Sequence, residues 1–197
     1  MHVFYLSTNV VCDENRAWFE AFRSANQCTE CGMLAPECRN GPVEVVVDQR
    51  PSQAALFAAH TPIGLGRVEF LRCFGEAFDR QFSIGQVVHR RGQRLAEMAS
   101  FVPRRPIVIR SPDPKCWICT TCGRFLYDRF GESDLFYVTK ESLGDHLCHG
   151  TDGSSLVVTH ELYERIDRHT WKSLVIRQLP VLDHPLDGID PFPENYY

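Results

Sequence analysis

The chain has 197 residues, of which 44% are hydrophobic and 23% charged, and its formal net charge is −4. This length is enough to bury a sizeable core, and the composition is that of an ordinary soluble globular protein, which excludes an extended disordered chain. A negative net charge provides no broad basic surface, so nucleic acid is disfavoured as a partner.

The cysteine count and the N-terminus indicate where the protein works. Nine cysteines are an odd number, and their C-x2-C spacing is that of metal ligands rather than of a secreted disulfide framework. The first residues lack the basic and long apolar regions of a signal peptide, and no apolar run reaches the roughly 18 residues of a membrane span. These features predict a cytoplasmic protein with no membrane contact.

The N-terminal quarter predicts a strand, a helix and a second strand. Val3–Leu6 is short and apolar, as in a buried strand. Asp13 is a suitable N-cap for a helix that carries Trp18 and Phe22 at helical spacing. The β-branched run Val43–Val47 then predicts another strand.

The middle of the chain predicts mostly helices. Apolar residues at steps of three and four over Val68–Phe82 indicate one amphipathic helix whose phenylalanines face the core. Shorter helices are expected at Gln53–Ala59 and Gln93–Phe101. Short strands are expected at Gln86–His89 and Ile107–Ile109.

Two cysteine motifs, far apart in the chain, carry the most specific signal. The first is Cys28-Thr29-Glu30-Cys31-Gly32 and the second is Cys119-Thr120-Thr121-Cys122-Gly123. A C-x2-C pair followed by glycine can direct both sulfurs to one side of a tight turn, where the glycine adopts a positive φ. Cys116 lies three residues before Cys119 and leaves an alternative pairing open, but only Cys119 and Cys122 carry the glycine.

Together the motifs supply the four thiolates of a closed, tetrahedral, structural zinc site, with Cys28, Cys31, Cys119 and Cys122 as ligands. The motifs are roughly 90 residues apart, whereas a compact zinc module separates its ligand pairs by roughly 15–20 residues. Such a site would join the N- and C-terminal halves of one fold. Redox-active or merely packed cysteines are the alternative interpretations.

A second group of ligand-type side chains is found at Asp145–Gly150. His146, Cys148 and His149 could form another metal site with Cys116, or a Cys-His nucleophile. Adjacent residues rarely face each other, and the sequence provides no third group to orient such a pair. A polar loop is therefore the favoured interpretation.

The C-terminal third predicts a hairpin and a β-α-β unit. The hairpin is expected from Phe125–Tyr127 and Leu135–Val138, on either side of Gly131. Leu156–Val158 and Leu174–Ile176 read as strands, with a helix capped by Thr159 between them.

The predicted fold class is α+β, a single domain over residues 1–180 with an antiparallel or mixed sheet, flanking helices and a zinc-ribbon-like four-cysteine site. Residues 181–197 are expected to form an irregular acidic and aromatic tail that includes Asp183, Asp187, Asp190 and Glu194.

The two CxxCG motifs, the strand that ends at Val47-Asp48, and the segments Val158–Leu162 and Val175–Pro180 resemble the double-CXXCG-motif family. This is a myxobacterial paralogous group that includes immunity proteins of polymorphic toxin systems. The resemblance implies a cytoplasmic protein that binds and neutralises a cognate toxin domain and has no catalysis of its own. The acidic tail would suit a basic, nuclease-like toxin surface.

Two other functions remain open from the sequence. One is a zinc-ribbon adaptor that contacts nucleic acid or the transcription machinery, although this would require a basic face. The other is an enzyme whose site comprises His146, Cys148 and His149.

Overall fold

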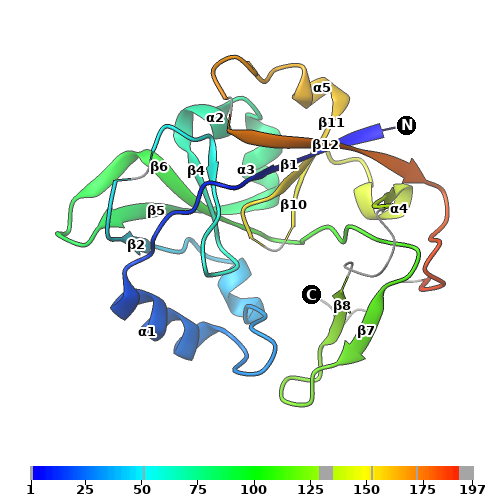
Figure 1. The fold of residues 1–197 in the computed structure, drawn as a ribbon, viewed down its shortest axis with the longest axis horizontal. Helices are drawn as coiled ribbons and strands as arrows, with labels where there is room; N and C mark the ends of the chain where they lie inside the picture. The colour runs from blue at the N-terminus through cyan, green and yellow to red at the C-terminus, as the bar shows by residue number, and fades with distance from the viewer. Residues whose placement is uncertain (1, 51, 129–134, 152, 172, 191–197) are drawn as a thin grey trace.

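Two five-stranded β-sheets form the framework of the computed structural model (Figure 1), which describes residues 2–50, 52–128, 135–151, 153–171 and 173–190. A two-stranded hairpin stands apart from both sheets. One domain contains helices together with sheets whose strands pair in both parallel and antiparallel directions. The predicted α+β class with a mixed sheet is therefore confirmed.

The first sheet is built around the N-terminal strand. Its order is β10-β11-β1-β12-β9, with β12 and β9 parallel and the other neighbours antiparallel. In chain order its strands are β1 (His2–Thr8), β9 (Val138–Thr139), β10 (Cys148–Gly150), β11 (Leu156–Thr159) and β12 (Leu174–Leu182). The predicted β-α-β unit is present through helix α5 (His160–Tyr163), but it is split, because β1 lies between β11 and β12.

The second sheet has the order β2-β5-β6-β4-β3, and only β2 and β5 are parallel. Its strands are β2 (Val45–Val47), β3 (Leu56–Phe57), β4 (Gly64–Arg67), β5 (Phe82–His89) and β6 (Arg94–Pro103). The helices predicted at Gln53–Ala59 and Gln93–Phe101 are therefore wrong. In β6 the side chains of Ala99 and Phe101 enter one core cluster and those of Met98 and Val102 another, which is the two-residue period of a strand.

The expected helix over Val68–Phe82 is two short helices. Helix α2 (Val68–Arg72) and helix α3 (Glu76–Gln81) are separated at Gly75, whose φ of 53° is a conformation that residues with a side chain rarely adopt. Phe82 already belongs to β5. The break lets the chain turn while its phenylalanines still face the core.

Phenylalanine side chains fill the space between the two sheets. The cluster joins Leu6 and Val158 of the first sheet to Phe101 of the second. Phe78 stacks on Phe82 with ring centroids 4.1 Å apart. Because full burial of such a side chain contributes roughly 1.5–3 kcal/mol, this cluster is the main apolar contact between the sheets.

Helix α1 (Arg16–Asn26) covers the other side of the second sheet, where Phe22 packs with Val45 and Val47. Its N-cap is Asn15 and not the predicted Asp13: the Asn15 side chain accepts a hydrogen bond from the Trp18 amide at 3.1 Å. The same side chain donates to Asp48 at 2.8 Å, which ties the start of the helix to the end of β2.

The separate hairpin consists of β7 (Lys115–Ile118) and β8 (Phe125–Asp128). The hairpin predicted between Phe125–Tyr127 and Leu135–Val138 is wrong, because β8 pairs with β7 and Val138 pairs with β12. Gly131, at its expected turn, is outside the described residues. The expected strand Ile107–Ile109 is instead a buried segment without regular pairing, and helix α4 (Lys140–Leu143) follows β9.

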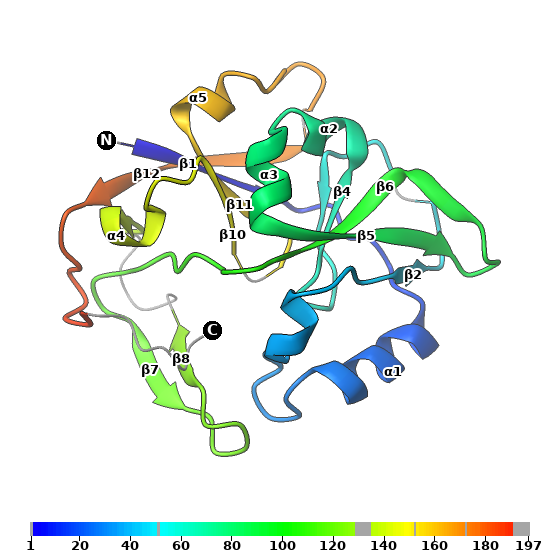
Figure 2. The ribbon, with the colours of Figure 1, turned by 180° about the vertical axis from the view of Figure 1, so that it is seen from behind.

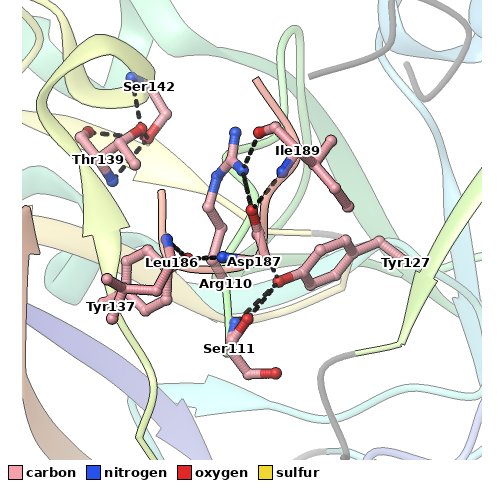
Figure 3. Close-up of polar contacts among 9 residues, drawn as sticks. All are labelled: Arg110, Ser111, Tyr127, Tyr137, Thr139, Ser142, Leu186, Asp187 and Ile189. Atoms are coloured by element: carbon pink, nitrogen blue, oxygen red, sulfur yellow. Dashed lines mark hydrogen bonds and ion pairs between the residues drawn. The ribbon is translucent and has the colours of Figure 1, made fainter. Parts of the chain in front are cut away.

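The segment after β12 is held in place by a buried ion pair (Figure 3). Arg110 donates to both carboxylate oxygens of Asp187, at 2.9 and 3.1 Å, and to the carbonyl of Ile189 at 2.7 Å. The Tyr127 hydroxyl of β8 donates to the same carboxylate at 2.9 Å. Burial raises the pKa of Tyr127 and the Asp187 carboxylate raises it further, so the hydroxyl keeps its proton.

This contact corrects the expectation for the tail. Val181 and Leu182 complete β12, two residues beyond the expected boundary of the domain. The Asp187 side chain has no exposed surface, so it cannot face a partner. Asp183 is exposed and pairs with Lys140, and Glu194 is outside the described residues.

In the part of the chain that the structure describes, no helix combines the length and the apolar character needed to cross a membrane.

Replacing Arg110 with methionine should lower the free energy of unfolding by about 3–5 kcal/mol, because Asp187 would keep a buried charge without its counter-ion. Urea denaturation measures this. Lys140→Met is the matched control: its pair with Asp183 is exposed, so the loss should stay below about 1 kcal/mol. Equal losses for the two variants would contradict the role given to the buried pair.

Candidate metal centre

The first CxxCG motif forms a tight turn directly after helix α1. The Gly32 amide donates to the Cys28 carbonyl at 2.9 Å, and the Cys28 amide donates to the Met33 carbonyl at 3.0 Å. Gly32 has a φ of 71°, as the sequence predicts for this position. The turn thus directs both of its sulfurs to one side.

The second motif repeats this turn at the tip of the β7–β8 hairpin. The Gly123 amide donates to the Cys119 carbonyl at 2.9 Å, the Cys119 amide donates to the Arg124 carbonyl at 2.9 Å, and Gly123 has a φ of 70°. The two motifs are therefore the same local structure formed twice by similar sequences.

The two turns meet, although their cysteines are 91 positions apart in the chain. Their loops lie side by side in both views (Figures 1 and 2). The sulfurs of Cys28 and Cys119 are 3.7 Å apart, as are those of Cys31 and Cys122, and all four lie within 4.8 Å of one another. Four sulfurs bound tetrahedrally at about 2.3 Å from one ion lie about 3.8 Å apart, so the four cysteines could hold a metal ion.

Glu30 of the first motif also binds the second motif directly. One of its carboxylate oxygens accepts from the Thr120 hydroxyl at 2.8 Å, and from the Thr121 hydroxyl and amide at 2.7 and 3.0 Å. The Thr121 hydroxyl is the main reason that the pKa of Glu30 falls to about 2. Arg124 adds a further contact by donating to the carbonyl of Leu34.

The thiols of the cluster differ in how readily they lose their protons. The amide of Cys31 lowers the pKa of Cys28 to about 6, whereas burial raises the pKa of Cys31 to about 12. Four neighbouring thiolates would repel one another in the absence of a positive ion. Four thiolates also leave no open coordination position, so the donor set is that of a structural site for a soft metal ion.

The structure brings together the four sulfurs that the sequence analysis named as ligands, and the third cysteine near the second motif is not among them. Cys116 is exposed on β7 and lies outside the cluster. The sequence analysis missed the role of Glu30. Glu30 could have been found by comparing the middle residues of the two motifs, Thr29-Glu30 and Thr120-Thr121, because it is the one position at which they differ.

The second group of ligand-type residues is a loop only in its first half, Asp145 to Leu147. Cys148 and His149 lie in β10 and are buried, while His146 is exposed just before the strand. Within the described ranges no metal-binding group includes these residues. Burial raises the pKa of the Cys148 thiol, which is the opposite of what a thiolate nucleophile requires.

A comparison with models of protein families finds none that matches this chain, and a search of curated proteins finds no significant match. The resemblance to the double-CXXCG-motif family therefore rests on the residues of the sequence itself.

Replacing Cys31 or Cys122 with serine should remove the bound metal and strongly destabilise the protein, because a structural site of this kind contributes about 10–16 kcal/mol on binding. Metal content and thermal unfolding measure the effect. Cys116→Ser and Cys73→Ser are the matched controls and should change stability by less than about 1 kcal/mol, since both lie outside the cluster. A similar loss in all four variants would contradict the ligand assignment.

Metal affinity should fall as the pH falls, because protons compete with the metal ion for the thiolates. A chromophoric chelator of known affinity, used at about pH 7.5 and pH 5.5, should remove the metal more readily at the lower pH. The melting temperature should decrease in parallel with metal loss. An affinity independent of pH would exclude thiolate ligands.

Proposed function

We propose that the resident metal is zinc and that its role is structural. The four-cysteine donor set and the closeness of its sulfurs, all within 4.8 Å of one another, support zinc, with iron as the other ion that accepts such a set. Elemental analysis of the purified protein, with an absorption spectrum to detect iron-thiolate bands, tests the identity of the metal.

We further propose that the protein is an immunity protein, a rigid non-catalytic scaffold that binds and neutralises one cognate toxin domain. The observation that carries this proposal is the convergence of the two CxxCG motifs on one site. Those motifs are the specific part of the resemblance to the double-CXXCG-motif family. Of the three other segments of that resemblance, one ends with β2, and the remaining two lie at β11–α5 and in β12, on either side of β1.

The toxin contact is proposed to lie on the β7–β8 hairpin. Trp117 and Ile118 are 50% and 62% exposed, directly before the ligand Cys119. A cavity of about 410 Å³ beside them is lined by Trp117, Met33 and Leu126. Exposed tryptophan held on a rigid element is typical of residues that dominate binding energy at protein interfaces.

The acidic tail is no longer the best candidate for this contact. Asp187 is buried, and removing residues 181–197 would also remove the end of β12. Point substitutions on the hairpin are the cleaner experiment.

Trp117→Ala should weaken binding to the toxin encoded beside this protein by about 30-fold or more, the loss of a typical interface hot spot, while metal content stays unchanged. Calorimetry with the inactivated toxin and protection of toxin-expressing cells are the measurements. Val11→Ala is the matched control, since Val11 is a similarly exposed apolar residue (57%) outside the hairpin.

Equal affinity of the Trp117 variant and the original chain would remove the hairpin as the contact surface. Failure of the original chain to bind or protect against that toxin would overturn the immunity role. Tight binding to nucleic acid in the same assays would favour the adaptor function instead.

A further inference from the structure

A cavity of about 710 Å³ lies between the segment that follows the first cysteine turn and the segments around α4 and β10. Its described lining residues include the 3₁₀ helix η1 (Pro36–Arg39), the chain after β6, helix α4 and the end of β10. The volume is in the range of small-ligand sites, roughly 300–1,000 Å³.

The lining of this cavity is basic, although the chain as a whole is acidic. Its basic members are Arg39, Arg104, Arg105, Arg110, His146 and His149. Glu141 is the one carboxylate among the lining residues that the structure describes. Arg110 is already paired with Asp187, so the exposed Arg104 and Arg105 supply the positive charge that favours an anionic ligand.

Two of the four arginines are exposed and two are buried. Arg104 and Arg105 are exposed, and neither forms an ion pair with another described residue. Arg39 and Arg110 are only 4% and 3% exposed, and Arg110 also binds Asp187 (Figure 3). Only a small group can reach the buried residues, which argues against a flat macromolecular surface.

His149 supplies an independent indication of a ligand. His149 is one of the lining residues, it is 5% exposed, and its buried Nε2 has no hydrogen-bond partner within the described part of the chain. Burial, reinforced by the neighbouring His146, lowers the pKa of His149 to about 4, so the imidazole is neutral near pH 7. A buried nitrogen without a hydrogen bond costs free energy. A ligand that donates a hydrogen bond to Nε2 would recover this cost and bind more tightly.

We propose that this cavity is a binding site for the phosphate group of a small phosphate ester or phosphoanhydride, with Arg104 and Arg105 at its entrance and His149 at its base. The planar guanidinium fork matches phosphate oxygens in pairs, and a phosphate that retains a proton, or an ester hydroxyl, can donate to the imidazole nitrogen. The site does not depend on toxin binding, so it goes beyond the immunity role.

Isothermal titration calorimetry of the metal-loaded full-length protein tests the proposal. The probes are inorganic pyrophosphate and ADP, with citrate as a polycarboxylate control, all at a constant ionic strength of about 150 mM to suppress nonspecific attraction. Saturable binding of one equivalent of pyrophosphate or ADP, at least tenfold tighter than citrate, is expected. Tighter binding of ADP than of pyrophosphate would identify a nucleotide as the source of the phosphate, and equal binding would identify the phosphate moiety alone.

Two pairs of adjacent exposed arginines provide the matched variants. Arg104→Glu with Arg105→Glu should weaken binding at least tenfold, whereas Arg90→Glu with Arg91→Glu, in the turn between β5 and β6, should leave it unchanged. His149→Phe, if it folds, should also weaken binding without changing metal content. The absence of saturable binding, equal affinity for citrate, or equal loss in both arginine pairs would overturn the proposal.

Discussion

The contact between four sulfurs from two distant turns is the constraint on which the other parts of this structure depend. It brings the end of helix α1 to the tip of the β7–β8 hairpin, and this hairpin has no strand neighbour in either sheet. Exposed two-stranded hairpins have little stability of their own. A metal ion bound by these four sulfurs would close a long loop and supply order that burial of apolar surface does not provide in this region.

Two sets of polar contacts also hold the β7–β8 hairpin in place beside the first cysteine turn. Glu30 accepts hydrogen bonds from Thr120 and Thr121 across the two turns, and the Arg110–Asp187 pair fixes the chain that leads into the hairpin. The basic cavity is bounded by Arg39, shortly after the first turn, and by Arg104 to Arg110, shortly before the second. Two of its walls thus belong to the segments that the four cysteines bring together, and helix α4 and strand β10 supply the others.

The sequence predicted the convergence of the four cysteines better than the fold because the two kinds of signal differ in range. A glycine after C-x2-C determines a local turn, and the repeated motif identifies which second cysteine pair joins the first. Both signals are local in the sequence, so finding the four cysteines requires no knowledge of the tertiary structure. The region Gln93–Phe101 was wrong because its apolar residues fit both a helix and a strand, and pairing with β5 decides between them. The Arg110–Asp187 pair and the cavity depend on residues distant in the chain, which a single sequence does not connect.

X-ray absorption spectroscopy at the metal edge of the purified protein tests the four-sulfur centre most directly. The geometry predicts one metal ion per chain, surrounded by four sulfur atoms at about 2.3 Å, with no oxygen or nitrogen neighbour. A mixed coordination shell, or a metal-free protein in which Cys28, Cys31, Cys119 and Cys122 titrate as ordinary thiols, would contradict it.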